Sequence, residues 1–352
     1  MAPYHSTRFV LAKQMGLILL SVSAFAQQYT AQRQGEVVRL EDVKNHVYVL
    51  IMPSHGNGAF EMRANGKKVI QFPYDTAEQY KAGRSMSGIP FLAPWANRLD
   101  DTAFYANGKK YVFNMDLGNV RATNNIPMHG FLTTASQWEV TELKSDGDSA
   151  WVTSRLDFYR QPDWMAQFPF AHTIEMTYRL HDGVLEVKTA LHNLSAEPMP
   201  VAIGFHPYFQ VNDAPRDEWT IGIAARTNWV LKQGLPNGET RPIEELVPNP
   251  AGTPLKGLRL DDVFTDLVRD ASGRATMFIQ GKKERVEVLL GPNYRSVVVW
   301  APGPTMQFVC LEPMAGITNA LNLAQKGIYK ELQYVQPGGV WQESFWVRPV
   351  GF

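Results

Sequence analysis

Alternation of apolar and polar residues, with a period of two, runs through this sequence from about residue 35 and limits the fold more than any other feature. Residues 172–195, HTIEMTYRLHDGVLEVKTALHNLS, form two alternating runs joined by the turn sequence His-Asp-Gly. Residues 275–291, ATMFIQGKKERVEVLLG, repeat the pattern around GKKE. Such runs, separated by short turns, predict antiparallel hairpins whose strands bury one face.

Other segments extend this pattern. Residues 296–303 (SVVVWAPG) and 343–350 (ESFWVRPV) are strand candidates, and Asn-Gly turns in residues 64–72 and 106–113 predict two more hairpins. Helical periodicity is scarce, and residues 75–83, DTAEQYKAG, predict a short helix that ends at Gly83. The Pro- and Gly-rich residues 241–257 are expected to form a long surface loop. The sequence therefore predicts an all-β fold, with residues 27–352 as one large antiparallel β-sandwich domain.

The N-terminus has the features of an export signal. Arg8 and Lys13 precede the apolar run MGLILLSVSAFA, which ends in a small-x-small cleavage site at Ala26. We therefore predict a signal peptide over residues 1–26 and a periplasmic location, with secretion as the alternative. The apolar run of about a dozen residues is shorter than the ~20 needed to span a bilayer, so no stable membrane insertion is expected after cleavage. A retained interfacial anchor is the other possibility.

The charge balance and the cysteine content exclude further classes. Lysine plus arginine and aspartate plus glutamate number 34 each among the 352 residues, so the formal net charge is zero. Nucleic acid is therefore not expected as a partner, because proteins that bind it carry a basic excess. Cys310 is the only cysteine, so no intrachain disulfide can form. The sequence also lacks zinc-type His/Cys spacing, a Walker loop and a G-x-S-x-G elbow.

A histidine interrupts the apolar residues 201–211, VAIGFHPYFQV. Alternation places Ala202 and Gly204 on the face of His206 and the larger side chains on the other face. These small neighbours would leave room for a ligand, and Pro207 predicts that the strand ends or bulges there. His206 is therefore either a core histidine satisfied by backbone groups or a titratable group that points into a cavity.

A similar question arises at residues 305–314, TMQFVCLEPM. If this segment is a strand, Met306, Phe308, Cys310 and Glu312 share one face. Desolvation on such an apolar face would raise the pKa of the Glu312 carboxyl, which suits a general base near neutral pH. The alternative is a glutamate at the end of a strand that simply reaches water.

The remaining candidates occur in loop-like contexts and could equally be structural or exposed. They are His129 in MHGF, Asn97 and Arg98 in PWANRLDD, and Asp261 and Asp262 in RLDDVF.

Taken in order, these segments resemble the aldose 1-epimerase (galactose mutarotase) family, from about Val37 to Val347. The segments that carry the resemblance are GIPFLAPWANRLDDTAFYANGKKYVF, MHGF, FPFAHTIEMTYRL, LHNLSAEPMPVAIGFHPYF, LDDVF, FVCLEPMAGITNALN and VQPGGVWQESFWV. The resemblance implies a large antiparallel β-supersandwich with an open sugar cleft and neither a metal nor a redox cofactor. The implied reaction interconverts the α and β anomers of a free aldose, a small-molecule sugar.

The resemblance also implies roles for individual residues. Glu312 would be the general base that takes the proton from the C1 hydroxyl, and His206 the general acid that protonates the ring oxygen from the opposite side. The residues expected to bind sugar hydroxyls are His129, Arg98, Asp261 and Asn97. Asp261 is preferred to Asp262 because the Asp-x-x-Phe spacing ends on Phe264.

Three alternatives remain at this point. The segment before Asn97 departs from the galactose-active pattern toward branches that include hexose-6-phosphate mutarotases, for which Arg84 and Arg98 are the candidate phosphate ligands. A carbohydrate-binding protein without catalytic activity could have the same fold. A glycosidase could use Asp261 and Glu312 as paired carboxylates across a cleft, with His206 pointing away. The sequence leaves the oligomeric state open.

Overall fold

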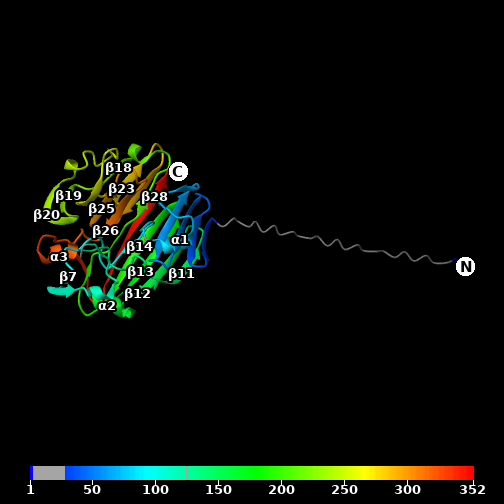
Figure 1. Cartoon of the computed structure of the whole chain (residues 1–352). Helices are drawn as coiled ribbons and strands as arrows, with labels where there is room; N and C mark the ends of the chain where they lie inside the picture. Colours follow the sequence, from blue (N-terminus) through cyan, green and yellow to red (C-terminus); the bar gives the residue numbers. More distant parts are fainter. Residues whose placement is uncertain (3–27, 84, 124–125) are drawn as a thin grey trace.

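Antiparallel strands dominate the computed structural model, which describes residues 1–2, 28–83, 85–123 and 126–352 (Figure 1). In the described part of the chain, the largest sheet has nine strands in the order β11 (Glu139–Ser145), β12 (Ala150–Asp157), β13 (His172–His181), β14 (Val184–Asn193), β28 (Val340–Val350), β24 (Arg285–Leu290), β23 (Ala275–Gln280), β18 (Thr220–Gly222) and β21 (Thr253–Pro254). Every neighbouring pair in this sheet is antiparallel.

Two other sheets pack against this one. Within the described ranges, a five-stranded sheet contains β1 (Tyr29–Gln34), β2 (Val37–Asp42), β3 (Val47–Met52), β4 (Gly58–Ala64) and β5 (Lys67–Lys68). Over the same ranges, an eight-stranded sheet contains β20 (Leu235–Pro242), β19 (Thr227–Lys232), β22 (Leu260–Thr265), β25 (Ser296–Ala301), β26 (Val309–Met314), β16 (Gly204–Phe205) and β6 (Phe91–Leu92), with β17 (Tyr208–Phe209) also paired to β26.

The remaining elements are short. Strand pairs are formed by β7 (Ala103–Ala106) with β8 (Lys109–Val112), β9 (Ala122–Thr123) with β10 (Ile126–Pro127), and β15 (Met199–Val201) with β27 (Gln333–Val335). The α-helices are α1 (Ala77–Ala82), α2 (Pro162–Gln167) and α3 (Ala320–Gln325), and the 3₁₀ helices are η1 (Met115–Leu117), η2 (Phe158–Arg160), η3 (Arg216–Glu218) and η4 (Ile243–Glu245).

The predicted fold class is confirmed, and so are the predicted hairpins. The run at 172–195 becomes β13 and β14, which turn at Asp182-Gly183, and the run at 275–291 becomes β23 and β24. The Asn65-Gly66 and Asn107-Gly108 turns join β4 to β5 and β7 to β8. The predicted helix is α1, which is followed by Gly83 as expected. Its N-cap is Thr76, whose hydroxyl accepts a hydrogen bond from the Gln79 backbone N–H.

The prediction of a long surface loop over residues 241–257 is only partly correct. This segment contains η4 and β21, and β21 extends the nine-stranded sheet at its edge. Ile243, Val247 and Leu255 are fully buried and belong to the main core. Its Pro and Gly residues therefore separate short anchored pieces, and the apolar residues between them fix the segment to the sheet.

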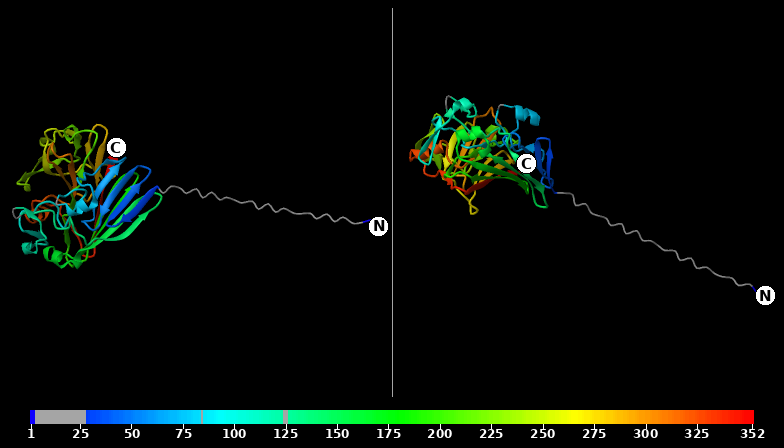
Figure 2. Two further views of the ribbon diagram at one scale, coloured as in Figure 1. Left: turned by 45° about the vertical axis from the view of Figure 1, so that its right-hand side comes forward. Right: turned by 90° about the horizontal axis from the view of Figure 1, so that it is seen from below.

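The sheets are stacked in layers. The five-stranded sheet lies over β11, β12 and β13, and in the eight-stranded sheet β26 contacts β23 (Figure 2). One large cluster of buried side chains includes residues from all three sheets. The central strands β13 and β14 bury apolar side chains in alternation from end to end, as the sequence pattern predicts, whereas the edge strand β11 has no buried residue.

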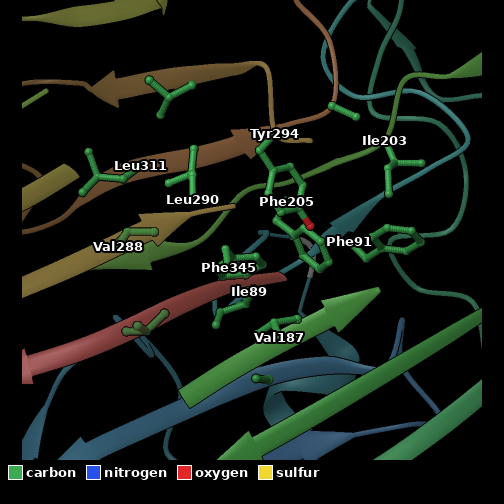
Figure 3. Packing of buried hydrophobic residues seen from close by; sticks show 14 of the residues in the cluster. Ile89, Phe91, Val187, Ile203, Phe205, Val288, Leu290, Tyr294, Leu311 and Phe345 are labelled. Carbon is green, nitrogen blue, oxygen red and sulfur yellow. The ribbon is translucent and has the colours of Figure 1, made fainter. Parts of the chain in front are cut away.

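Phe205 connects the eight-stranded sheet to this core (Figure 3). Its ring centroid lies 5.1 Å from that of Phe91 and 4.9 Å from that of Phe345 on β28. Successive side chains of an extended segment point to opposite sides. Burying Phe205 in the core therefore directs the next residue, His206, away from the core.

The predicted signal peptide, residues 1–26, falls outside the described residues apart from Met1 and Ala2 and stays a prediction. No helix among the described residues has the length and apolar character needed to cross a membrane.

Candidate active site

A cavity of about 550 Å³ opens on the side of the eight-stranded sheet that faces away from the main core. All six residues that the sequence singled out for catalysis or sugar binding line it: Asn97, Arg98, His129, His206, Asp261 and Glu312. They come from five separate places in the chain, so the fold brings together groups that are more than 200 residues apart in sequence. Arg84, a candidate phosphate ligand, is not among the described residues.

His206 occupies a break between two short strands. The extended segment is interrupted at His206 and Pro207, between β16 and β17, as the proline predicts. The backbone N–H groups of His206 and Tyr208 donate to the carbonyl oxygens of Pro90 (3.0 Å) and Gly88 (2.9 Å). The segment is thus held on both sides of the proline, and the imidazole reaches the cavity with only 7% of the residue exposed.

The expected reason for space beside His206 is wrong. A Cβ atom at Gly204 would lie 2.1 Å from the Met314 sulfur and 3.0 Å from Cβ of Ala96, so this space is filled by protein. Gly204 allows β16 to approach β26, where Met314 pairs with it in the ladder. The ligand space lies instead beyond the imidazole, on the side where Glu312 and His129 converge.

Glu312 lies on β26 and is 1% exposed. Its Oε1 atom lies 3.3 Å from Nε2 of His206. Among the described residues, neither Oε2 of Glu312 nor Nδ1 of His206 has a hydrogen-bond partner. The two groups lie side by side. The sequence resemblance instead implies that they act from opposite sides of the substrate, and this expectation is wrong. A hemiacetal can still use both groups, because its hydroxyl oxygen and its ring oxygen are bonded to the same carbon.

Burial shifts both groups toward their neutral forms. Desolvation raises the pKa of Glu312 well above its usual value, and the negative charge of Asp261 adds to this while Arg98 opposes it. Desolvation lowers the pKa of His206 to about 4, and Arg98 and Arg121 add to that shift. A protonated Glu312 beside a neutral His206 would hold one transferable proton. Moving this proton to His206 gives a carboxylate and an imidazolium with the same total number of protons.

His129 is held against the cavity by an unusual loop. Its backbone N–H donates to the carbonyl oxygen of Asn97 (2.8 Å), and both residues have positive φ, 64° and 57°. The next residue, Gly130, also has positive φ, and a Cβ there would lie 2.0 Å from the carbonyl oxygen of Ala93. Desolvation lowers the pKa of His129 well below its usual value, and the positive charges around it contribute. His129 is therefore neutral near pH 7, and its Nδ1 atom has no partner within the described ranges.

Arg98 and Asp261 form the polar edge of the cavity. The Nη2 atom of Arg98 lies 3.4 Å from Oδ2 of Asp261, and its Nη1 atom donates to Oδ1 of Asn97 at 3.1 Å. Asp261 lines the cavity and is exposed, whereas burial raises the pKa of Asp262. The Asp-x-x-Phe spacing thus selected the aspartate that faces the cavity. These groups offer hydrogen-bond donors and acceptors suited to hydroxyl groups.

Sequence reasoning missed the aromatic wall of the cavity. Tyr208 stacks on His206 with a centroid distance of 4.9 Å, and the ring of Trp300 stands edge-on to His206 at 5.7 Å. Phe308 packs against the rings of Tyr208 and Trp300. Two signals could have found them: Tyr208 lies two residues after His206, and Trp300 pairs with Asp261 across the β22–β25 ladder. Aromatic faces of this kind pack against the C–H groups of sugar rings.

Comparison with known proteins identifies the family. A sequence model described as aldose 1-epimerase matches residues 42–348. A galactose mutarotase-like protein from Clostridium acetobutylicum has a similar structure, with a TM-score of 0.78, 23% identity, and coverage of 92% of this chain and 98% of that chain. The chain belongs to the aldose 1-epimerase family. Its members are isomerases that act on carbohydrates, so the resemblance drawn from the sequence is confirmed.

Two further solved structures share the fold of this epimerase. The galactose 1-epimerase from Lactobacillus acidophilus NCFM has a TM-score of 0.70 at 13% identity, covering 91% of this chain and 97% of that chain. The GalM/aldose epimerase homologue from C. elegans has a TM-score of 0.69 at 15% identity, covering 88% and 97%. At such identities the likeness shows that the fold is shared.

His206 and Glu312 also lie beside a thiol. Nitrogen, sulfur and oxygen atoms of His206, Cys310 and Glu312 all lie within 4.8 Å of one another, a grouping that could ligate a metal ion. Burial raises the pKa of the Cys310 thiol well above its usual value, and the negative charges of Glu312 and Asp261 add to this. The thiolate is the metal-binding form, so this environment disfavours ligation. A metal there would also occupy the contact between Glu312 Oε1 and His206 Nε2.

The close approach at Gly130 gives the first test of the site. We expect Gly130→Ala to lower the free energy of unfolding by about 1–3 kcal/mol more than Gly118→Ala does. Both glycines have positive φ, but a Cβ at Gly118 would meet nothing within 4 Å, whereas the one at Gly130 meets the backbone of Ala93. Denaturant unfolding of the two variants measures the difference. Equal losses of stability would show that the His129 loop tolerates the added methyl group.

Proposed function

We propose that this protein is a mutarotase that interconverts the α and β anomers of a free aldose, with Glu312 as the general base and His206 as the general acid. The observation that carries the proposal is the 3.3 Å contact between Glu312 Oε1 and His206 Nε2 at the wall of the cavity. Membership of the aldose 1-epimerase family supports the reaction type. The assignment of individual residues rests on their position and chemistry.

The proposed reaction needs one proton removed and one delivered. In the carboxylate–imidazolium form, Glu312 accepts the proton of the C1 hydroxyl while His206 donates its Nε2 proton to the ring oxygen. The bond between C1 and the ring oxygen breaks, and C1 becomes an aldehyde carbon. After rotation about the C1–C2 bond, the reverse transfers close the ring with the other configuration. The pair ends with the same proton count, so no net proton or electron is consumed.

The neighbouring groups fit the binding of a sugar. His129, Arg98, Asp261 and Asn97 present donors and acceptors around the cavity, and they would bind ring hydroxyls and orient C1 toward the pair. The aromatic wall of Tyr208, Trp300 and Phe308 would pack against the apolar face of the ring.

The geometry disfavours the other functions considered. A glycosidase that used Asp261 and Glu312 would require His206 to point away, yet His206 contacts Glu312 and Asp261 pairs with Arg98. A protein that only binds sugars would gain nothing from burying a carboxylate beside an imidazole, because burial of ionisable groups costs free energy of folding. Arg98 is already paired, which also weakens a phosphate site that depends on it.

Replacement of either member of the pair tests the proposal. We expect Glu312→Gln and His206→Asn each to lower kcat by about 10²–10⁴-fold, the usual contribution of a general acid or base. NMR measurement of anomer exchange on the mature protein, with galactose, glucose and other aldoses, gives the rates. Glu41→Gln and His181→Asn are matched controls that lie outside the cavity lining. Sugar binding with exchange at the rate of buffer in the unmodified protein would contradict the mutarotase assignment.

The pKa shifts predict an unusual pH profile. Activity needs the pair to hold one proton, so it falls when a second proton binds at low pH and when the last one leaves at high pH. Because the pKa of His206 is lowered to about 4 from an ordinary 6.5, kcat/KM should stay level from pH 7 to about 5. The raised pKa of Glu312 places the alkaline decline well above the usual carboxyl range. An acid decline centred near pH 6.5 would show that the pair is not desolvated.

We also propose that residues 1–26 direct export and are then removed, because the charged start, the short apolar run and Ala24-Phe25-Ala26 occur in the order of a signal peptide. When the full chain is expressed in a bacterial host with a periplasm, we expect the periplasmic protein to begin at Gln27. Fractionation followed by mass spectrometry of the intact protein checks this. Full-length protein in the membrane fraction would favour a retained anchor, and full-length protein in the cytoplasm would contradict export.

A further inference from the structure

Arg121 contributes a positive charge to the cavity, and no group among the described residues neutralises it. It lines the same cavity as Glu312 and His206, and its backbone carbonyl accepts a hydrogen bond from Met128 N–H, next to His129. Its side chain is exposed, and among the described residues none forms an ion pair or a hydrogen bond with its guanidinium. Arg98 differs, because its guanidinium already contacts Asp261 and Asn97.

Over the described residues that line the cavity, the sum of charges is therefore positive. Arg98 and Asp261 cancel each other as an ion pair. Glu312 and His206 share one proton, so that pair has no net charge in either of its forms, and His129 is neutral near pH 7. Arg121 leaves a net charge of about one positive unit on the lining. A cavity with such an excess attracts a ligand of opposite charge.

The position of Arg121 indicates which part of a sugar would carry that charge. Desolvation is the largest cause of the lowered pKa of His129 and of His206, and positive charges that include Arg121 lower both values further. For Glu312, the charges that act besides desolvation are Asp261 and Arg98. The geometry agrees, because the backbone carbonyl of Arg121 accepts from Met128 N–H and the ring of the next residue, His129, has its centroid 5.5 Å from that of His206. Arg121 therefore lies on the His206 side of the cavity. In the proposed reaction His206 contacts the ring oxygen, and the carbon next to that oxygen, C5, carries the exocyclic group of a hexopyranose. A sugar bound with C5 on the His129 side of the ring oxygen would therefore direct its exocyclic group toward Arg121.

Resting on the proposed mutarotase function, we propose that the natural substrate is a hexuronate, an aldose whose exocyclic group is a carboxylate, and that Arg121 binds this carboxylate. A planar guanidinium offers two parallel N–H donors that match the two oxygens of a carboxylate. The charge also favours a carboxylate over a phosphate. A phosphate monoester carries about −1.5 to −2 charges near pH 7, more than the one unpaired arginine among the described lining residues neutralises.

Anomer exchange of four sugars tests this proposal. We would compare galacturonate, its neutral methyl ester, galactose and galactose 6-phosphate at pH 7, and repeat the series with glucose-derived sugars. We expect kcat/KM for the hexuronate to exceed that for its methyl ester by about 10- to 100-fold, the range that a charge-assisted hydrogen bond supports. The ester has nearly the same shape, so the ratio reports the charge. Added salt should reduce this ratio.

Substitution of Arg121 tests whether this residue causes the preference for the hexuronate over its methyl ester. Arg121→Gln should bring the ratio of hexuronate to ester close to one. Arg226→Gln is the matched control, because Arg226 is also exposed but does not line the cavity, and it should keep the ratio of the unmodified protein. A ratio that Arg121→Gln leaves unchanged would overturn the assignment of the carboxylate to Arg121.

The remaining outcomes separate this inference from the proposed function. Exchange of galactose and the ester at the same kcat/KM as the hexuronate would overturn the inference and leave the mutarotase function intact. Faster exchange of the 6-phosphate than of the hexuronate would also overturn it and would assign the cavity to phosphosugars. If no aldose exchanged faster than in buffer, the proposed function and this inference would both fail.

Discussion

The burial of Glu312 against His206 is the constraint on which the rest of the site depends. A carboxyl group and an imidazole that were both open to water would keep their ordinary pKa values, and near pH 7 they would hold no proton between them. Desolvation moves the pKa of Glu312 up and that of His206 down, which keeps one proton on the pair. That proton is what a reversible ring opening requires. The surrounding protein must therefore exclude water from both groups while leaving one side open to a sugar.

The eight-stranded sheet is irregular at the position of this pair, and the irregularity leaves room for the cavity. β26 continues through Glu312 as an ordinary buried strand, but its neighbour is divided into β16 and β17 by His206 and Pro207. The loops that close the cavity contain Asn97 and His129 with positive φ, and Gly130 in direct contact with a backbone carbonyl. Such conformations cost free energy and are retained where the surrounding structure enforces them. The packing of the regular strands of the nine-stranded sheet offsets the free energy cost of these strained conformations.

The sequence predicted the fold well because the signal for strands is local. In β13 and β14 every second side chain is apolar, and the turn at Asp182-Gly183 fixes the register, so the hairpin needs no distant information. Residues 241–257 were misjudged because Pro and Gly indicate a loop, while the burial of Ile243 and Leu255 depends on strands that lie elsewhere in the chain. Local patterns cannot show which distant surface covers an isolated apolar residue.

The same distinction explains the success and the limits at the site. The alternation of Phe205 and His206 placed the imidazole opposite the core, and the structure agrees. The argument from Gly204 failed because Met314, more than 100 residues later, fills the space beside it. Family resemblance selected residues that converge on the cavity but gave no reason to notice Arg121 or Trp300. Their relevance follows from the cavity, which exists only once the strands and loops are assembled.

The charge of Arg121 also links substrate binding to the state of the acid. In the protein without ligand, Arg121 and Arg98 add to the desolvation that lowers the pKa of His206. A substrate carboxylate that pairs with Arg121 would cancel part of this positive field and would exclude further water from the cavity. Cancellation favours the imidazolium form of His206, which is the form that donates a proton to the ring oxygen. Binding of the exocyclic group would then favour the protonation state that the first proton transfer requires.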